Sequence, residues 1–247
     1  MRDLKLAVIG DPVAHSASPA LHRGFLAEAG LAGTYEAIRV GAGEGAREIA
    51  RLRAAGYTGL NVTTPLKEEA FACAAERDAA ARAAHSVNTL VLAGDRIRGY
   101  NTDGLGALGA LRDAGLASVA GKRLLVLGAG PTARSCIASF VECGALVFVW
   151  NRTIEKARSI AAHLGARIRT PGDAPPDAVL SALPPHALPD DAALRDALAA
   201  APLVIDANYG ERATLGAALG RPVIDGAAML RASARASFDR FRAALER

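Results

Sequence analysis

The stretch VLGAGPTA, residues 126–133, carries the pattern G-x-G-x-x-A directly after an apolar run that is typical of a buried strand. Gly128 permits a tight turn, and Gly130 lets a phosphate group approach the backbone. Ala133 allows the helix that follows to pack closely against the strand. This order of strand, turn and helix predicts a doubly wound parallel sheet with a dinucleotide at the helix N-terminus. The alternative is a glycine-rich turn that binds no ligand.

The rest of the second half alternates strands and helices in the same way, after a linking helix over 104–115. We predict strands at KRLLVLG, ALVFVWN, residues 166–169, AVLSAL, PLVIDA and PVID, and helices from Pro131, from Ile154 and over 190–200. Such alternation is typical of a Rossmann-type sheet with helices on both faces. Residues 104–226 therefore form a predicted dinucleotide-binding domain.

The first part of the chain forms a separate α/β pattern. Apolar and periodic runs predict strands over 4–10, 34–40 and 57–63 and helices over 18–30 and 44–55. Ser18 reads as a helix N-cap with Pro19 at the first helical position, and Gly94-Asp95 reads as the turn of a hairpin. We predict one α/β domain over 1–103 and a single amphipathic helix over 227–247.

The strand that follows the glycine-rich turn ends in FVWNRTIEKA. Enzymes that use NAD usually place Asp or Glu there to bind the ribose 2′-hydroxyl. This chain has Asn151, Arg152, Thr153 and Lys156 instead. Because a carboxylate repels a 2′-phosphate and an arginine binds one through two hydrogen bonds, the pattern predicts NADP. Thr153 can also cap the next helix while Arg152 is solvated, and the two interpretations are compatible.

The predicted first domain carries three polar groups that suit a small-molecule substrate. NVTTPLK contributes Thr63 and Lys67, VNTL contributes Asn88, and YNTDGLG contributes Asp103. A lysine beside an alcohol or ketone can transfer a proton as a general acid or base. The alternatives are that Lys67 is solvated and that Asp103 caps the linking helix.

Composition limits the partners that the chain can have. Hydrophobic residues make up 51% of the sequence, yet no window approaches the ~18 unbroken apolar residues of a membrane span, and no signal-type segment opens the chain. The net charge of +4 is dispersed over helical patterns, and the five histidines lack metal-ligand spacing. We expect a cytoplasmic protein that binds no membrane, nucleic acid or metal. Widely spaced Cys73, Cys136 and Cys143 predict buried thiols in a reducing compartment.

Several motifs follow one another in a single order. They are G-x-P-x-x-H-S-x-S-P-x-x-H, N-V-T-x-P-x-K, V-N-T, N-T-D-x-x-G, G-A-G and N-R-T-x-x-K-A, with G-x-x-M-L near the C-terminus. In this order the sequence resembles the shikimate dehydrogenases along nearly its whole length. The resemblance implies a substrate domain, a Rossmann-type NADP domain and a cleft between them. It also implies that 227–247 packs back on the substrate domain.

The resemblance assigns roles to individual residues. Ser16 and Ser18 match two serines that bind the substrate carboxylate; the N-cap position explains Ser18 without a ligand, but not Ser16. Lys67 and Asp103 match the catalytic pair. Further predicted substrate contacts are Thr63, Asn88, Tyr209 and Ser233. The predicted cofactor contacts are Gly128, Ala129, Gly130, Pro131, Thr132, Ala133, Asn151, Arg152, Thr153, Lys156, Gly226 and Met229.

The chain departs from the family pattern in four places. Ser233 replaces a glutamine that contacts the substrate, and SALPPHA over 181–187 replaces the loop N-A-T-x-x-G-M. Pro131 replaces a glycine, and His85-Ser86 replaces Gly-Ala. These changes fall where substrate and nicotinamide are expected to meet, which is consistent with a diverged paralogue.

The resemblance implies an NADP-dependent oxidoreductase that interconverts 3-dehydroshikimate and shikimate, a step of aromatic amino acid biosynthesis on the route to chorismate. Lys67 would act as acid and base with Asp103. One alternative is the same chemistry on quinate or another cyclic hydroxy acid. Another is a nucleotide-binding paralogue with little turnover. The expected partner is a small carboxylate, and the expected state is a monomer or homodimer.

Overall fold

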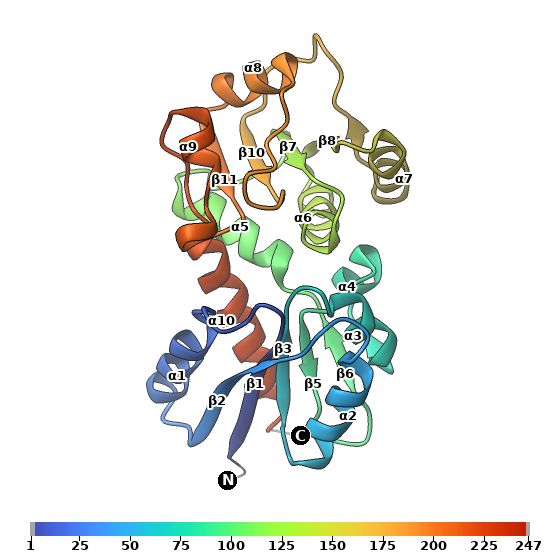
Figure 1. The fold of residues 1–247 in the computed structure, drawn as a ribbon, viewed down its shortest axis with the longest axis vertical. Helices are drawn as coiled ribbons and strands as arrows, with labels where there is room; N and C mark the ends of the chain where they lie inside the picture. The colour runs from blue at the N-terminus through green and yellow to red at the C-terminus, as the bar shows by residue number, and fades with distance from the viewer. Residues whose placement is uncertain (1–2, 246–247) are drawn as a thin grey trace. The chain divides into compact units, whose positions relative to one another are not determined.

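The computed structural model describes residues 3–245, which fall into two compact units (Figure 1). The chain up to Thr102 and the chain from Ser233 onwards form unit 1. Asp103–Ala232 forms unit 2. Helix α10 (Ala227–Ala243) contributes to both units. The predicted domains differ here, because Met229 packs in the core of unit 2 whereas Phe238 packs in that of unit 1.

Unit 1 contains a mixed six-stranded sheet in the order β2-β1-β3-β5-β6-β4. Its strands are β1 (Leu4–Gly10), β2 (Gly33–Arg39), β3 (Gly59–Val62), β4 (Glu76–Arg77), β5 (Thr89–Val91) and β6 (Arg98–Tyr100). Strand β1 pairs in parallel with β2 and β3, whereas β5 is antiparallel to both β3 and β6. The β5–β6 pair is the hairpin predicted around Gly94.

Helices cover both faces of this sheet: α1 (Ser18–Glu28), α2 (Gly45–Ala54), α3 (Lys67–Cys73), α4 (Ala79–Ala84) and the end of α10. Alternate residues of β1 point to opposite faces, as the strand period requires. One set packs with α1 and α10 in a cluster of Leu4, Leu6, Val8, Phe25, Phe238 and Phe241. The other packs with α2 and α3 in a cluster that includes Ala7, Ile9, Ile49, Leu52 and Ala70.

Unit 2 contains a five-stranded, wholly parallel sheet in the order β11-β10-β7-β8-β9. Its strands are β7 (Arg123–Leu127), β8 (Leu146–Trp150), β9 (Arg167–Ile168), β10 (Ala178–Ser181) and β11 (Leu203–Asp206). Its helices are α5 (Asp103–Asp113), α6 (Pro131–Glu142), α7 (Ile154–Leu164), α8 (Ala192–Ala200), the 3-10 turn η1 (Gly210–Arg212) and α9 (Leu215–Leu219). The predicted doubly wound α/β fold is thus confirmed.

The two faces of this second sheet carry separate apolar clusters. Leu124 and Val126 of β7 pack with α5 and α6, while Leu125 and Leu127 pack with α8 and α9. Because β7 is buried on both faces, its sequence is a continuous apolar run rather than an alternating one. The glycine-rich turn therefore begins at the carboxyl end of β7, in the centre of the sheet.

Two expectations were wrong in detail, and two short elements were missed. The predicted strand PVID contributes only one isolated bridge, between Ile205 and Ile224. Helix α9 and the short β4 have no counterpart among the predicted elements, since both are too short to show a period. Cys143 is exposed rather than buried, because it lies at the C-cap of α6, whereas Cys136 on the inner face of that helix is buried.

Within residues 3–245, no helix is long and apolar enough to cross a membrane. The same part of the chain contains no group of three or more His, Cys, Asp or Glu side chains that could hold a metal ion.

Candidate active site

Residues 11–18, which we call the serine loop, connect β1 to the first turn of α1. The local roles of its two serines differ from those expected. Ala17 is the N-cap of α1, and no side chain caps it. Ser18 is the first helical residue, so the prediction of Ser18 as the N-cap was wrong. Ser16 is the serine with a local role, because its Oγ accepts a hydrogen bond from Ser18 N at 3.2 Å. Ser18 itself is buried, with 7% of its surface exposed.

The serine loop runs beside the loop that follows β3. Strands β1 and β3 are parallel neighbours, so their carboxyl ends meet at one edge of the sheet. Backbone hydrogen bonds join the two segments, from Thr63 N to Ile9 O at 2.9 Å and from Asp11 N to Thr64 O at 2.9 Å. A Cβ at Gly10 would lie 2.4 Å from Thr63 Cγ2, so glycine is required for this approach. Ser16, Ser18 and Thr63 thus gather at one edge of the sheet.

Lys67 is the first residue of α3 and is buried, with 8% of its surface exposed. The alternative that Lys67 is simply solvated is therefore wrong. Its helix is tied to the start of α2 by Glu69, whose carboxylate accepts hydrogen bonds from Gly43 N at 2.8 Å and Gly45 N at 2.9 Å. This contact holds α3, and with it the backbone of Lys67, against a second helix.

Asn88 is buried where β3 and β5 meet. Its Oδ1 accepts hydrogen bonds from Thr102 N at 3.0 Å and Thr89 Oγ1 at 2.9 Å. Its Nδ2 donates to Thr102 Oγ1 at 3.1 Å. Because a backbone N–H can only donate, the bond from Thr102 N sets which end of the amide is oxygen. The side chain of Asn88 is therefore held in one orientation.

Ser233 on α10 packs against the same group. Its Oγ lies 2.8 Å from Thr102 Oγ1 and 3.5 Å from Asn88 Nδ2, and the residue is 8% exposed. The short side chain that replaces the family's glutamine is thus engaged inside unit 1. It contacts two groups of the candidate site through its hydroxyl.

A buried histidine lies on α1, next to the serine loop in sequence. His22 is fully buried and stacks on Tyr35, with ring centroids 4.3 Å apart. Neither of its ring nitrogens has a hydrogen-bond partner in the described part of the structure. Burial, aided by the positive charge of Arg235, lowers the pKa of His22 to about 3. Burial also raises the pKa of Tyr35 well above its usual value.

The glycine-rich turn of unit 2 leads from β7 to α6. Gly128 has φ +114°, and a Cβ there would lie 3.2 Å from Ala182 O. Gly130 is the N-cap of α6, and nothing described lies within 4 Å of where its Cβ would be. Ala133 is fully buried in the core against the sheet. A tight turn, an open approach and close packing are the three features that a pyrophosphate site needs, so the turn fits a dinucleotide.

The other residues of this turn have distinct surroundings. Ala129 packs at the edge of the core, and Pro131 is the first residue of α6. Thr132 Oγ1 donates a hydrogen bond to Asp103 Oδ2 at 3.4 Å. Asp103 begins α5 and is 8% exposed, and the N–H of Gly104 behind it binds Ser135 Oγ at 3.1 Å. The turn and Asp103 are thus in direct contact within unit 2.

The residues that we expect to bind the 2′-phosphate follow β8. Asn151 Nδ2 donates to Thr153 O at 2.9 Å, which shapes the turn into α7. Thr153 is the N-cap of α7, but its side chain makes no capping hydrogen bond. Arg152 and Lys156 are exposed, and neither pairs with a carboxylate in the part of the chain that the structure describes. These two unpaired cations follow β8, the neighbour of β7 in the sheet, and they suit an anionic ribose phosphate.

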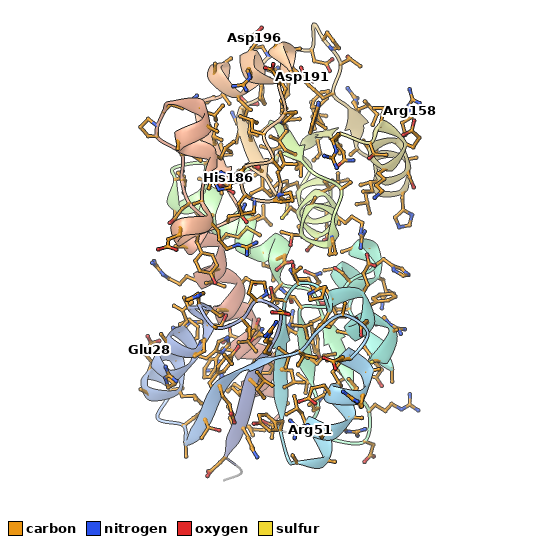
Figure 2. All side chains as sticks on the ribbon, viewed as in Figure 1. Glu28, Arg51, Arg158, His186, Asp191 and Asp196 are labelled. Carbon is orange, nitrogen blue, oxygen red and sulfur yellow. The ribbon has the colours of Figure 1, made fainter. Side chains whose placement is uncertain are left out.

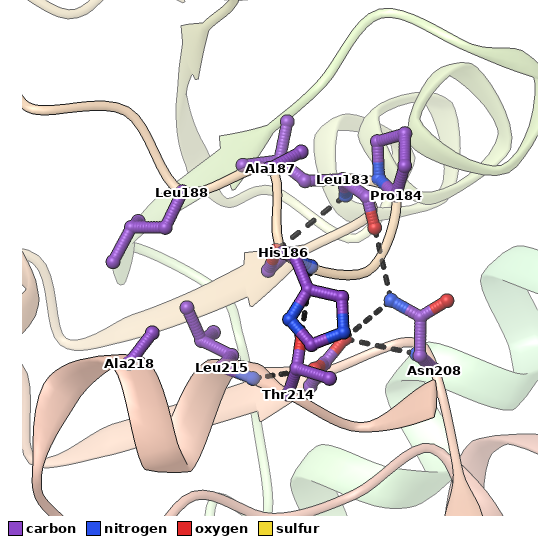
Figure 3. Close-up of a pocket in the computed structure, with 11 residues that line it drawn as sticks. Leu183, Pro184, His186, Ala187, Leu188, Asn208, Thr214, Leu215 and Ala218 are labelled. Atoms are coloured by element: carbon purple, nitrogen blue, oxygen red, sulfur yellow. Dashed lines mark hydrogen bonds between the residues drawn. The ribbon is translucent and has the colours of Figure 1, made fainter. Parts of the chain in front are cut away.

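The loop after β10, over 181–187, is the one whose sequence departs from the family pattern. It borders a small pocket (Figure 3). His186 has φ +59°, and its N–H donates to Thr214 Oγ1 at 2.9 Å. Asn208 Nδ2 closes the loop from the other side through Leu183 O at 2.9 Å and Asp206 Oδ1 at 2.8 Å. The loop is therefore held to the segment after β11 at two points.

Three predicted contacts lie near the end of unit 2. Tyr209 is half-buried at the start of η1. A Cβ at Gly226 would lie 2.4 Å from Ala207 O, so close backbone packing explains this glycine without a ligand. Met229 is 6% exposed and lies in the core, so its side chain is occupied by packing. Roles of these residues toward a ligand stay predictions.

The structure divides the predicted site residues between the units. Unit 1 holds the residues Ser16, Ser18, Thr63, Lys67, Asn88 and Ser233. Unit 2 holds Asp103, Tyr209 and all predicted cofactor contacts. The pairing of Lys67 with Asp103 and the cleft stay predictions. Tyr35, Asn61 and Ser237, which the structure adds to the group in unit 1, were missed; Asn61 opens the NVT motif, whereas Tyr35 and Ser237 stand in no motif.

Comparison with known proteins accords with this division. Residues 8–90 match the shikimate dehydrogenase substrate-binding domain, and residues 110–171 match the shikimate / quinate 5-dehydrogenase family. The chain is 43% identical over 160 residues to a shikimate dehydrogenase (NADP(+)) of Methylocella silvestris. That alignment covers 64% of this chain and 57% of the relative, so the chain matches less than two thirds of the relative's length.

Solved structures are similar over nearly the whole chain. Shikimate dehydrogenase from Aquifex aeolicus has a TM-score of 0.84 and 29% identity, covering 98% of this chain and 93% of its own. Shikimate 5-dehydrogenase from Thermus thermophilus, in complex with NADP(H) and shikimate, has a TM-score of 0.83 and 30% identity, covering 97% of this chain and 94% of its own. With its motifs standing at the strand ends and its fold matched from end to end, this chain belongs to the shikimate dehydrogenase family.

Proposed function

We propose that this protein is an NADP-dependent oxidoreductase that interconverts 3-dehydroshikimate and shikimate. The observation that carries the proposal is the gathering of Ser16, Ser18, Thr63, Lys67 and Asn88 within unit 1, on segments that leave β1 and β3 or lead into the antiparallel β5. Membership of the family and the names of its relatives support the same activity. A cytoplasmic location and a monomeric or homodimeric state remain predictions.

The serine loop suits a substrate carboxylate. Hydroxyl groups are short neutral donors, and two of them can bind the two oxygens of one carboxylate. Ser16 and Ser18 stand two residues apart in a segment anchored to β3 by backbone hydrogen bonds. Thr63, whose N–H belongs to that anchor, would bind a neighbouring hydroxyl of the ring.

Lys67 is the residue that we assign to proton transfer. During oxidation the ring alcohol loses its hydroxyl proton to Lys67 Nζ as the C–H bond breaks, and the reverse step returns that proton to the ketone oxygen. NADP(H), when bound, accepts or supplies the hydride. Asp103 would orient the lysine and the substrate hydroxyl, and Asn88 would hold a further ring hydroxyl through its fixed amide.

Unit 2 fits the cofactor that this reaction requires. The open backbone at Gly130 would receive the pyrophosphate, and Arg152 with Lys156 would bind the ribose 2′-phosphate. No carboxylate occupies the end of β8, where an NAD enzyme usually has one.

Absorbance at 340 nm tests the proposal directly. The protein should reduce NADP⁺ in the presence of shikimate, and NAD⁺ should serve less well. Lys67→Ala should lower kcat by about 10²–10⁴-fold, the usual worth of general acid–base assistance. Absence of shikimate-dependent reduction in the unmodified protein would refute the activity, and a variant with normal kcat would refute the role of Lys67.

Quinate is the second candidate, and Ser233 is the observation that favours it. The hydroxyl of Ser233 is turned to Thr102 and Asn88, so this position lacks the longer amide that the family's glutamine extends to shikimate. Ser233→Gln should raise kcat/KM for shikimate by roughly 2–12-fold if shikimate is the substrate, the worth of one net hydrogen bond. If quinate is the substrate, the same change should lower kcat/KM for quinate. Activity with neither acid would favour a nucleotide-binding paralogue with little turnover.

A further inference from the structure

We infer that Tyr35 and Ser237 are positioning residues, which hold the Asn88–Thr102 pair through one buried chain of hydrogen bonds that passes through Asn61. This inference rests on the proposed function for its link to substrate. All members of this hydrogen-bond chain belong to unit 1, and they come from β2, β3, the start of β5, the segment before α5, and α10.

The first half of this hydrogen-bond chain runs from β2 to β3. Tyr35 is 3% exposed, and its hydroxyl donates to Asn61 Oδ1 at 2.8 Å. Because a carbonyl oxygen can only accept, Tyr35 fixes which end of the Asn61 amide is oxygen and turns the other end, Nδ2, away from it.

The second half of the hydrogen-bond chain runs from Asn61 to α10. Asn61 Nδ2 donates to Ser237 Oγ at 3.0 Å. Ser237 is fully buried, and its own proton goes to Ser233 O at 2.9 Å. Its oxygen can therefore only accept, as it does from Asn61, and it lies 3.0 Å from Thr89 Oγ1 and 3.2 Å from Thr102 Oγ1.

Those two threonines orient the amide of Asn88. Thr89 Oγ1 lies 2.9 Å from Asn88 Oδ1, and Thr102 Oγ1 lies 3.1 Å from Asn88 Nδ2. A change at Ser237 therefore alters the side chains that hold Asn88 without touching Asn88 itself. Tyr35 and Ser237 are too deeply buried to meet a ligand, so any effect that they have on substrate must pass through Asn61, Thr102 and Asn88.

A buried hydrogen-bond chain can also serve stability alone, and the readouts must separate the two roles. The variants are Tyr35→Phe, Ser237→Ala and their combination, each of which removes only a hydroxyl. Tyr57→Phe is the matched control, because Tyr57 is also buried in unit 1 but donates its hydroxyl to Glu36, outside the chain.

Steady-state kinetics give the first readout. Tyr35→Phe and Ser237→Ala should each raise KM for shikimate by about 3–10-fold, the size of one lost hydrogen bond, and leave KM for NADP⁺ unchanged. Because both substitutions break the same chain of hydrogen bonds, the combined variant should raise KM by clearly less than the product of the two single effects. Unchanged KM in both single variants, or fully multiplicative effects, would overturn the inference.

Amide hydrogen exchange gives a readout that needs no activity. Thr102 N–H is bonded to Asn88 Oδ1, so its exchange reports how firmly that amide is held. Tyr35→Phe and Ser237→Ala should speed exchange at Thr102, and Tyr57→Phe should not. Unchanged exchange at Thr102 overturns the inference, even if the unmodified protein proves inactive on shikimate; inactivity with faster exchange refutes only the proposed function.

Discussion

His22 is a histidine that the fold keeps neutral. Its ring is packed among Phe25, Tyr35, Phe238 and Phe241, and no hydrogen-bond partner is described for either nitrogen. Arg235 adds a positive charge nearby, although it also pairs with Glu28 at the surface (Figure 2). Protonating this ring inside the core is therefore unfavourable, which is why its pKa falls to about 3.

This burial predicts an acid-sensitive fold. An unfolded histidine titrates near pH 6.5, so between about pH 6.5 and pH 3 the unfolded state binds the additional proton. The stability contributed by neutral His22 is complete above that window and is lost as pH falls through it, by about 1.4 kcal/mol per pH unit. Denaturant unfolding from pH 7 to pH 4.5 should show this slope. His22→Leu should flatten it, whereas His15→Gln, at an exposed loop position, should leave it intact.

His186 is a second unusual histidine, because its backbone lies in the left-handed region at φ +59°. The family pattern N-A-T-x-x-G-M has glycine at this position, and a side chain there costs about 1–2 kcal/mol. Since glycine also loses more entropy on folding, His186→Gly should raise the free energy of unfolding by a net ~0.5–1 kcal/mol. His186→Ala keeps the Cβ and should show no such gain. Equal gains in denaturant unfolding would show that the imidazole, not the backbone, is unfavourable.

At the scale of elements, the contact between α3 and α2 determines where Lys67 stands. Glu69 places its carboxylate on two N–H groups at the start of α2, where the helix dipole favours negative charge. A Cβ at Gly45 would lie 2.8 Å from Glu69 Oε2, so the glycine leaves room for this contact. The helix that carries the proposed proton donor is thus attached through a side chain two residues away.

Removing that carboxylate should destabilise unit 1. Glu69→Ala leaves two N–H groups without their acceptor and should lower the free energy of unfolding by about 1–3 kcal/mol. Glu69→Gln retains one acceptor oxygen and should cost less than the alanine variant. Glu142→Ala, at an exposed position of α6, controls for the loss of a carboxylate in general. A loss as large for Glu142→Ala as for Glu69→Ala would contradict the role of the contact.

The turn between β8 and α7 should decide which dinucleotide binds. Arg152→Ala should weaken NADPH binding by roughly 10–100-fold, as expected for lost charge-assisted hydrogen bonds, and should hardly change NADH binding. Fluorescence titration with both cofactors measures the two dissociation constants. Arg158→Ala, on the exposed side of α7 (Figure 2), is the matched control and should affect neither. Equal affinity of the unmodified protein for NADPH and NADH would contradict the cofactor assignment.

For the whole molecule, the two units should respond to different ligands. A ligand protects the amides of the segments that it stabilises against exchange. NADP⁺ alone should slow exchange in the β7–α6 and β8–α7 turns of unit 2, and shikimate alone should slow it in the serine loop and around Thr63 and Lys67 of unit 1. Hydrogen exchange read by mass spectrometry separates these peptides. Protection by shikimate confined to unit 2 would refute the assignment of substrate to unit 1.

Much of this architecture could be predicted from the sequence, because its signals are local. The period of the apolar residues predicts the strands and helices of both sheets, and the glycines of the turn after β7 predict its backbone. The motif PVID shows the limit of such signals. An apolar run forms a strand only where a neighbour pairs with it, and here Ile224 makes a single bridge to Ile205.

Only the tertiary structure decided which hydrogen bonds the site residues make. Ser16 rather than Ser18 bonds to the start of α1, and Ser233 binds Thr102, a residue far away in the sequence. Tyr35 and Ser237 enter the site through Asn61, although no spacing links them. A side chain's period predicts which face it occupies, whereas its hydrogen-bond partner depends on which other elements are packed against that face. The residue types and their order therefore specify the family and the chemistry, and the hydrogen bonds from β2 and α10 to Asn61 of β3 specify how the site is held.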